Sequence, residues 1–238
     1  MYARTTESPI LLLGAAHVID LSGPLRSVLG GRVLDGVAVE LDPERAGSLF
    51  APSSHPRDRS GLPLLPRLWA LVQRRLGSEL GGGEAGAEMK VAALVARERQ
   101  LPLFLIDDPL RLTVMRLVSS MPFKERIQLL VGAAVALFLP ARLVTREMDR
   151  YAAAPEAYAE QLRLASPTLA RVLLDERNEH MAERLVVLRL KGYGRIAAVV
   201  GDAHLPGLAA ALGRRGVAVE SIPFAKLREV RGPPSVPS

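Results

Sequence analysis

PILLLGAAHV, residues 9–18, consists of an apolar run, a glycine, two further residues and a histidine. The same frame returns near the other end of the chain in RIAAVVGDAHL, residues 195–205. Short apolar runs of this kind are typical of buried strands in parallel sheets. A glycine directly after a strand permits a sharp turn or the close approach of a ligand. Each stretch therefore predicts a buried strand followed by a histidine, His17 in the first and His204 in the second.

The segments between these two stretches alternate between strand and helix patterns. Further strands are expected over residues 36–41, 102–107 and 217–222. Helices are expected over residues 18–30, 84–100 and 205–216, and a helical block over residues 109–192. Within the block, Asp108 is expected to cap the first helix, and one helix is expected over residues 166–192, capped by Ser166 and ended by Gly192. This alternation predicts an α/β fold with a mostly parallel central sheet flanked by helices, into which the block forms a large helical insertion.

The length of 238 residues fits one domain, which we expect to cover residues 1–230. Within it, residues 51–66 are rich in Pro, Ser and Arg and are predicted to form a mobile loop. The last segment, RGPPSVPS, contributes residues 231–238, for which we predict a disordered tail.

Composition excludes several classes of function. The net charge is +6, but the basic residues are scattered among acidic ones and aromatic residues make up only 4%, so we expect no nucleic-acid partner. The chain has no Cys, which excludes disulfides, thiolate metal sites and a cysteine nucleophile and fits a reducing compartment. With Glu7 before a very short apolar run, the N-terminus does not resemble a signal peptide, and we expect a cytoplasmic protein.

The longest uncharged run is IQLLVGAAVALFLPA, residues 127–141. It is shorter than the ~20 residues that cross a bilayer, and Pro140 closes it. We expect a buried helix or the interface of a homodimer there. Association with a membrane surface stays open as an alternative.

Ionisable residues follow the first four predicted strands. They are His17, Glu40, Asp42, Asp107, Asp108 and His204. Because ligands bind outside the carboxyl ends of parallel strands, these side chains are expected to share one edge of the sheet. Two imidazoles there could bind one metal ion, or each could simply cap a strand end through a backbone hydrogen bond, and spacing alone leaves both readings open.

Other ionisable residues have structural readings that pattern alone favours. Glu88 lies in the first turn of a predicted helix, where the dipole stabilises a carboxylate. Glu176 and Arg177 fit an exposed salt-bridged helix face, with His180 four residues after Glu176 as a surface residue or one that supports the site. HExxH, Walker A and GxSxG motifs are absent from the sequence, so serine-based hydrolysis has no support.

The ordered segments of the chain resemble the TraB/PrgY/TIKI family over about residues 10–212. The matching segments are GAAHV, VAVELDPER, GAEMKVAALVARERQLPLFLIDD, RLTVMR, LLDERNEHMAERL and VVGDAHLPGL. The resemblance implies a fold shared with erythromycin-esterase-like and ChaN-like proteins and a divalent metal site built from two Gly-x-x-His motifs and acidic residues. TIKI proteins are metal-dependent proteases that clip Wnt near its amino end with manganese or cobalt, and PrgY-type members are linked to shutdown of peptide pheromones.

The resemblance carries over to this chain position by position. It implies that His17, His204 and Glu40 bind the ion. It implies catalytic roles for Glu40, Glu88, Arg116 and Arg177. Supporting positions are Gly14, Gly201, Asp107, Thr113 and Glu176. There are two departures: Asp108 stands where members often have Arg, and the chain lacks the hydrophobic C-terminal region of many members, so we expect a minimal soluble version or a shortened chain.

The expected function is metal-assisted hydrolysis of a peptide bond near the N-terminus of a peptide or protein. A divalent ion (Mn, Co or Zn) lowers the pKa of its bound water towards ~7, and the carboxylate that is not a ligand takes the proton. Arg116 or Arg177 would steady the oxyanion or a substrate carboxylate. The alternative is a non-catalytic metal- or haem-binding regulatory or scaffold protein associated with a membrane.

Overall fold

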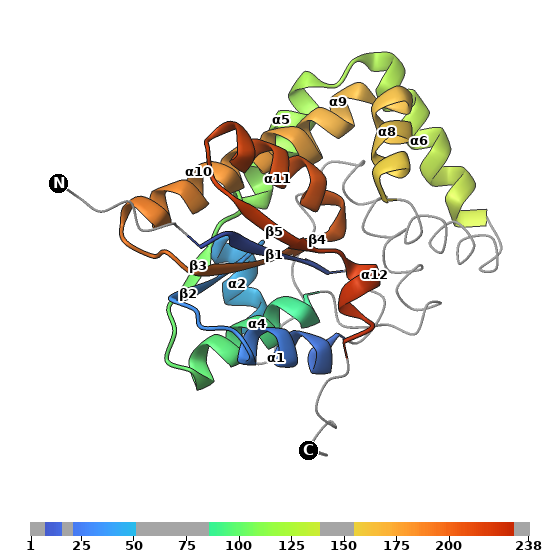
Figure 1. Ribbon diagram of the computed structural model, residues 1–238. Coiled ribbons are helices and arrows are strands. Elements are labelled where there is room, and N and C mark those ends of the chain that lie inside the picture. The colour runs from blue at the N-terminus through green and yellow to red at the C-terminus, as the bar shows by residue number, and fades with distance from the viewer. Residues whose placement is uncertain (1–7, 16–20, 51–85, 139–154, 231–238) are drawn as a thin grey trace.

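The computed structural model describes residues 8–15, 21–50, 86–138 and 155–230 (Figure 1). Its strands are β1 (Ile10–Ala15), β2 (Gly36–Val39), β3 (Leu103–Leu105), β4 (Ile196–Gly201) and β5 (Val219–Ile222). The α-helices are α1 (Ser22–Gly30), α2 (Pro43–Phe50), α4 (Ala87–Glu98), α5 (Leu110–Ser120), α6 (Phe123–Phe138), α8 (Pro155–Ala165), α9 (Pro167–Ala170), α10 (Glu176–Leu190), α11 (Leu205–Arg214) and α12 (Phe224–Leu227). A π-helix, η1 (Arg171–Asp175), and a 3-10 turn, η2 (Asp202–His204), complete the described elements.

The five strands form one sheet in the order β3-β2-β4-β1-β5, and every pair is parallel. This confirms the predicted α/β fold. The two strands of the repeated sequence frame, β1 and β4, are neighbours at the centre, with Gly14 opposite Val200 and Ala15 opposite Gly201. The carboxyl ends of β1 and β4 therefore lie side by side.

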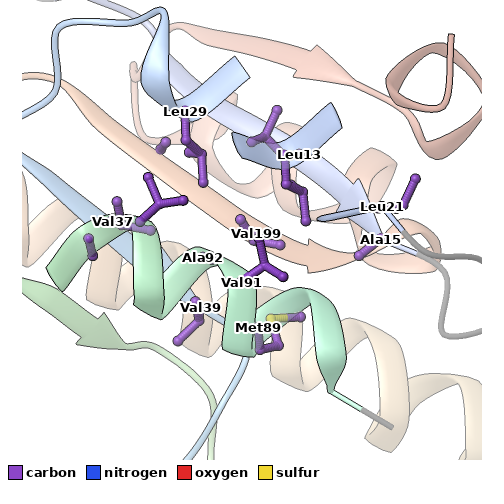
Figure 2. Packing of buried hydrophobic residues seen from close by; sticks show 14 of the residues in the cluster. Leu13, Ala15, Leu21, Leu29, Val37, Val39, Met89, Val91, Ala92 and Val199 are labelled. Carbon is purple, nitrogen blue, oxygen red and sulfur yellow. The ribbon is translucent and has the colours of Figure 1, made fainter. Parts of the chain in front are cut away.

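Alternate strand residues point to opposite faces of the sheet, and both faces are apolar. Leu13, Val39 and Val199 belong to the core that packs against α1 and α4, where Met89, Val91 and Ala92 line the facing side of α4 (Figure 2). The opposite face packs against α10 and α11. Its buried members include Leu12, Ala38, Ala198, Val200, Met181, Leu185 and Leu208. Burial on both faces explains why the strands are continuous apolar runs.

The helices that follow β1 and β4 pack on opposite faces of the sheet. The helix after β1, α1, packs on the same face as α4, whereas the helix after β4, α11, packs with α10 on the other face (Figure 1). Two adjacent parallel strands with diverging connections form a topological switch point, where open α/β sheets place their ligand sites. This switch point lies between the carboxyl ends of β1 and β4.

Most predicted elements are present with shorter bounds, and two local predictions are wrong. Asp108 was expected to cap a helix, but α5 begins at Leu110 and the Asp108 carboxylate binds side chains instead. The single helix expected over residues 166–192 is divided into α9, η1 and α10. Ser166 does not cap α9 with its side chain, because its hydroxyl donates to Glu125 Oε2 at 2.5 Å. Gly192 follows the end of α10 as predicted, with a φ of +96°.

Several predictions fall outside the described residues. They concern His17, the loop over residues 51–66, the tail over residues 231–238 and the end of the 127–141 run. Within the helical block, α10 lies on the sheet, while α5, α6, α8 and α9 gather beyond one end of it (Figure 1). Among the described helices, none combines the length and apolarity needed to cross a membrane.

Candidate functional site

Glu40 and His204 meet at the carboxyl edge of the sheet. Glu40 directly follows β2, His204 ends the turn η2 after β4, and β2 and β4 are neighbouring strands. The Nε2 atom of His204 lies 3.4 Å from Oε1 of Glu40. The amide of Gly201 donates to Oε2 of Glu40 at 2.6 Å, and a Cβ at Gly201 would lie 3.3 Å from that oxygen. Glycine at this position therefore lets the backbone approach the carboxylate.

Asn178 binds the other ring nitrogen of His204. The distance between Nδ1 of His204 and Oδ1 of Asn178 is 2.8 Å, and both side chains are buried. Asn178 is not among the site residues predicted from the sequence. Its position in a predicted helix could have indicated a special role, because asparagine is disfavoured inside helices and a buried asparagine requires a hydrogen-bond partner.

Arg177 joins Glu40 to Asp107. Its Nε donates to Oδ1 of Asp107 at 3.0 Å, and one terminal nitrogen donates both to Oδ2 of Asp107 at 2.7 Å and to Oε1 of Glu40. The Arg177 side chain is only 15% exposed, so the exposed salt-bridged face that pattern alone favours is wrong for this residue. Arg177 therefore lies between the carboxylates that follow β2 and β3.

Charge keeps the Glu40 carboxylate ionised. Burial raises the pKa of Glu40, but the charges of His204 and Arg177 and the hydrogen bonds from His204 and Gly201 outweigh it and hold that pKa well below its usual range. Burial lowers the pKa of Arg177, but the Glu40 charge and the bonds to Asp107 more than reverse this and raise it above its usual value. A buried carboxylate that stays ionised is a good ligand for a cation.

A second arginine supports Asp107 from the other side. Arg45 donates to Oδ2 of Asp107 and, through Nε, to Oδ2 of Asp42 at 2.7 Å. Asp42 also caps α2, because its Oδ1 accepts from the amides of Glu44 at 2.8 Å and Arg45 at 3.0 Å. We call the connected set the inner cluster. It consists of Glu40, Asp42, Arg45, Asp107, Arg177, Asn178 and His204.

A separate group of side chains lies around Asp108 and is called the rim cluster. It consists of Asp108, Arg116, Glu176 and His180. Arg116 donates to Oδ2 of Asp108 at 2.8 Å and lies 3.6 Å from Glu176, and Nδ1 of His180 lies 3.3 Å from Oδ1 of Asp108. The carboxylate of Asp108 thus contacts two basic side chains. Arg116 is 44% exposed, which makes it the arginine of the two clusters most open to a substrate.

The other predicted site residues take different places. Glu88 is buried in the first turn of α4, next to Met89, which packs close to Val39 (Figure 2). Thr113 is buried on α5. At Gly14 a Cβ would lie 2.7 Å from Cδ1 of Leu205 and 3.0 Å from the amide nitrogen of Phe224, so only glycine fits. These contacts explain Gly14 as a packing requirement at the edge of the switch point.

Glu40 and His204 supply two donors of the kinds that divalent cations accept, a carboxylate oxygen and an imidazole nitrogen 3.4 Å apart. The second ring nitrogen contacts Asn178, and the two oxygens of Glu40 also accept from Arg177 and Gly201. Metal-binding histidines commonly use one ring nitrogen for the ion and donate a hydrogen bond from the other. Within the described residues, groups of three His, Cys, Asp or Glu arranged for a metal are absent. The predicted ligand His17 lies outside them.

Comparison with known proteins gives matches over most of the chain. Residues 3–221 match the sequence profile of the TraB/PrgY/gumN family. An uncharacterized protein of Methanocaldococcus jannaschii is 31% identical over 221 residues, which are 87% of this chain and 54% of that protein. The chain therefore spans about half the length of this curated relative.

Proposed function

The chain belongs to the TraB/PrgY/gumN family, and from this premise we propose that it is a metal-dependent peptidase acting on the N-terminal segment of a peptide or protein. The observation that carries the proposal is the contact between Glu40 and His204 at the switch point of the sheet. An ionised carboxylate and an imidazole at this place are the donors that Mn, Co and Zn accept.

The residues of the switch point would hold the ion. Glu40 and His204 would bind it, with His17 from the segment after β1 as the third ligand. A divalent ion held there would supply a water of lowered pKa, towards ~7. Glu88 would serve as the general base.

The two arginines have different tasks in this proposal. Arg177 is committed to Glu40 and Asp107, and it keeps the Glu40 carboxylate ionised and oriented. Arg116 is exposed at the rim, and there its guanidinium can bind a substrate carboxylate or the developing oxyanion. The buried arginine therefore organises the site, and the exposed one contacts the substrate.

The test is cleavage of a peptide library by the purified chain, stripped of metal and then supplied with Mn²⁺, Co²⁺ or Zn²⁺. We expect cleavage that depends on the added ion and is lost in Glu40→Gln and His204→Ala. His180→Ala is the matched control for the ligand set, since His180 contacts the rim carboxylate Asp108, and its cleavage should still depend on the added ion. Equal cleavage by His204→Ala and the unchanged protein would contradict the proposal.

The exposed apolar side chains of α6 favour a second candidate function, association with a lipid surface. Phe123, Ile127 and Val131 recur every fourth residue on this helix and are 77%, 45% and 57% exposed. Side chains at this spacing share one helix face. Flotation with anionic vesicles should carry the protein upward and Phe123→Ser should reduce that fraction. A protein that stays at the bottom but sediments as a dimer would assign the face to a second copy of the chain.

A further inference from the structure

We propose that Asn178 is a positioning residue that determines which nitrogen of His204 faces Glu40. The inference rests on the proposed function in one respect, because that function makes Nε2 of His204 a ligand of the ion. It concerns the hydrogen on the imidazole ring, which can be observed without any metal.

The two side chains are held by different elements of the same buried layer. Asn178 lies in the first turn of α10, and His204 precedes α11. The two helices pack against each other on one face of the sheet, with Met181 and Leu208 in their shared core. The amide of Asn178 and the ring of His204 therefore meet at a fixed distance, 2.8 Å from Oδ1 to Nδ1.

The chemistry of the amide oxygen assigns the hydrogen. A carbonyl oxygen can only accept a hydrogen bond, so Nδ1 of His204 must carry the hydrogen. In a charged ring both nitrogens carry a hydrogen, and Nε2, which lies 3.4 Å from Oε1 of Glu40, then donates to that carboxylate. In a neutral ring the contact with Asn178 keeps the hydrogen on Nδ1 and leaves the lone pair on Nε2. With the hydrogen on Nε2 instead, the lone pair would point at Asn178 and away from the carboxylate. Asn178 thus presents the metal-binding nitrogen to Glu40.

Gly207 supports the same orientation of the amide. A Cβ at Gly207 would collide with Nδ2 of Asn178 and would lie 3.1 Å from its Cγ. The amide nitrogen therefore rests against the backbone of α11, and the oxygen is the atom turned to His204. This gives a way to displace the Asn178 amide without altering Asn178 itself.

The direct test is nitrogen NMR of the His204 ring in the metal-free protein. We expect a hydrogen on Nδ1 in the unchanged protein and in Asn178→Asp, because a carboxylate oxygen also accepts. In Asn178→Ala the acceptor is lost, and the hydrogen should move to Nε2, where Glu40 accepts it. Absence of the Nδ1 hydrogen from the unchanged protein, or its persistence in Asn178→Ala, would overturn the inference.

Metal affinity provides the second readout, measured by titrating Mn²⁺ and Zn²⁺ into each variant. Asn178→Ala and Gly207→Ala should bind about 10–100-fold more weakly than the unchanged protein, the usual effect of losing such a supporting contact. Asn178→Asp should bind comparably. Gly213→Ala is the matched control on the same helix, since a Cβ there meets nothing within 4 Å, and its affinity should not change.

The two experiments separate this inference from the function on which it rests. If the unchanged protein binds no metal, the proposed function fails. The NMR result still decides whether Asn178 determines which nitrogen of the His204 ring carries the hydrogen. If the protein binds metal and Asn178→Ala, still folded by circular dichroism, binds it equally well, the inference fails and the proposed function stands. Gly207→Ala keeps the inference testable even where Asn178→Ala does not fold.

Discussion

Arg177 and Asp107 are joined by two hydrogen bonds, 3.0 Å from Nε to Oδ1 and 2.7 Å from a terminal nitrogen to Oδ2, and the same guanidinium also binds Glu40. One planar side chain of α10 thus links the ends of two neighbouring strands, β2 and β3. A fork of five donors suits two carboxylates better than the single ammonium of lysine does. The inner cluster depends on this geometry.

Removal of Arg177 should therefore be costly. We expect Arg177→Met to lower the free energy of unfolding by about 3–5 kcal/mol, because it leaves buried carboxylates without their partner. Urea denaturation measures the loss. Arg26→Met is the matched control, since the Arg26–Glu98 pair is at the surface and should contribute no more than about 1 kcal/mol. Equal effects of the two substitutions would contradict a structural role for Arg177.

Gly14→Ala should disturb the switch point. The added methyl group would meet the carboxylate of Asp202, Cδ1 of Leu205 at 2.7 Å and the amide of Phe224 at 3.0 Å. Because Asp202 accepts from that amide at 2.7 Å, we expect a loss of about 1–3 kcal/mol from overpacking. Thermal unfolding of Gly14→Ala beside Gly213→Ala measures it. Gly213→Ala should stabilise the chain by up to about 1 kcal/mol, since that site is helical and open.

The Glu125 carboxylate should make stability depend on pH. It accepts from Ser166 Oγ at 2.5 Å, from Thr168 Oγ1 at 2.9 Å and from the Thr168 amide at 3.2 Å, and so caps α9 from α6. Burial raises the pKa of Glu125, but these hydrogen bonds outweigh it and lower that pKa below its usual value.

A folded-state pKa below the unfolded value gives stability that is present at neutral pH and disappears as the pH falls through the folded-state pKa. We expect Glu125→Gln to cost about 1–2 kcal/mol at pH 7. That difference should shrink as the pH falls below about 4.3, the ordinary pKa of glutamate. Unfolding curves of both proteins from pH 7 to pH 3 measure it. A difference that stays constant with pH would show that the carboxylate charge contributes nothing.

Arg116→Ala tests the assignment of substrate contact to the rim cluster. If peptidase activity is found, we expect kcat/KM to fall by about 10²-fold or more, as when one stabilising donor of an oxyanion is removed. The stability should change by less than about 1 kcal/mol, because the Arg116 side chain is 44% exposed. Arg111→Ala, an exposed arginine on the same helix, should leave kcat/KM unchanged. A loss of activity in both variants would point to the net charge and not to Arg116.

The fold was predictable because its signals are local. The apolar runs of β1 and β4 are buried on both faces, and this requires the continuous hydrophobic pattern that identifies them. The parallel arrangement follows from the alternation with helices. The strand order does not follow, because the sequence does not state that β1 and β4 pair, and the single-turn π-helix before α10 has no pattern of its own.

The candidate site was predictable in part. The strand-end positions of Glu40 and His204 could be read from the sequence, since parallel strands share one carboxyl edge. The contacts that hold them could not, because Arg177, Asn178 and Arg45 come from helices whose orientation to the sheet depends on tertiary packing. Asp108 shows the limit most clearly: the same residue type before a proline fits a helix cap, and its partners Arg116 and His180 are known only once α5 and α10 are placed.

The cation site at Glu40 and His204 is best tested by equilibrium dialysis of the chain against Mn²⁺, Co²⁺ and Zn²⁺, followed by elemental analysis. We expect one bound ion for each chain of the unchanged protein and of His180→Ala. In Glu40→Gln and in His204→Ala, each still folded, we expect the affinity for the ion to fall at least tenfold. Full metal content in Glu40→Gln and His204→Ala together would contradict the proposed cation site.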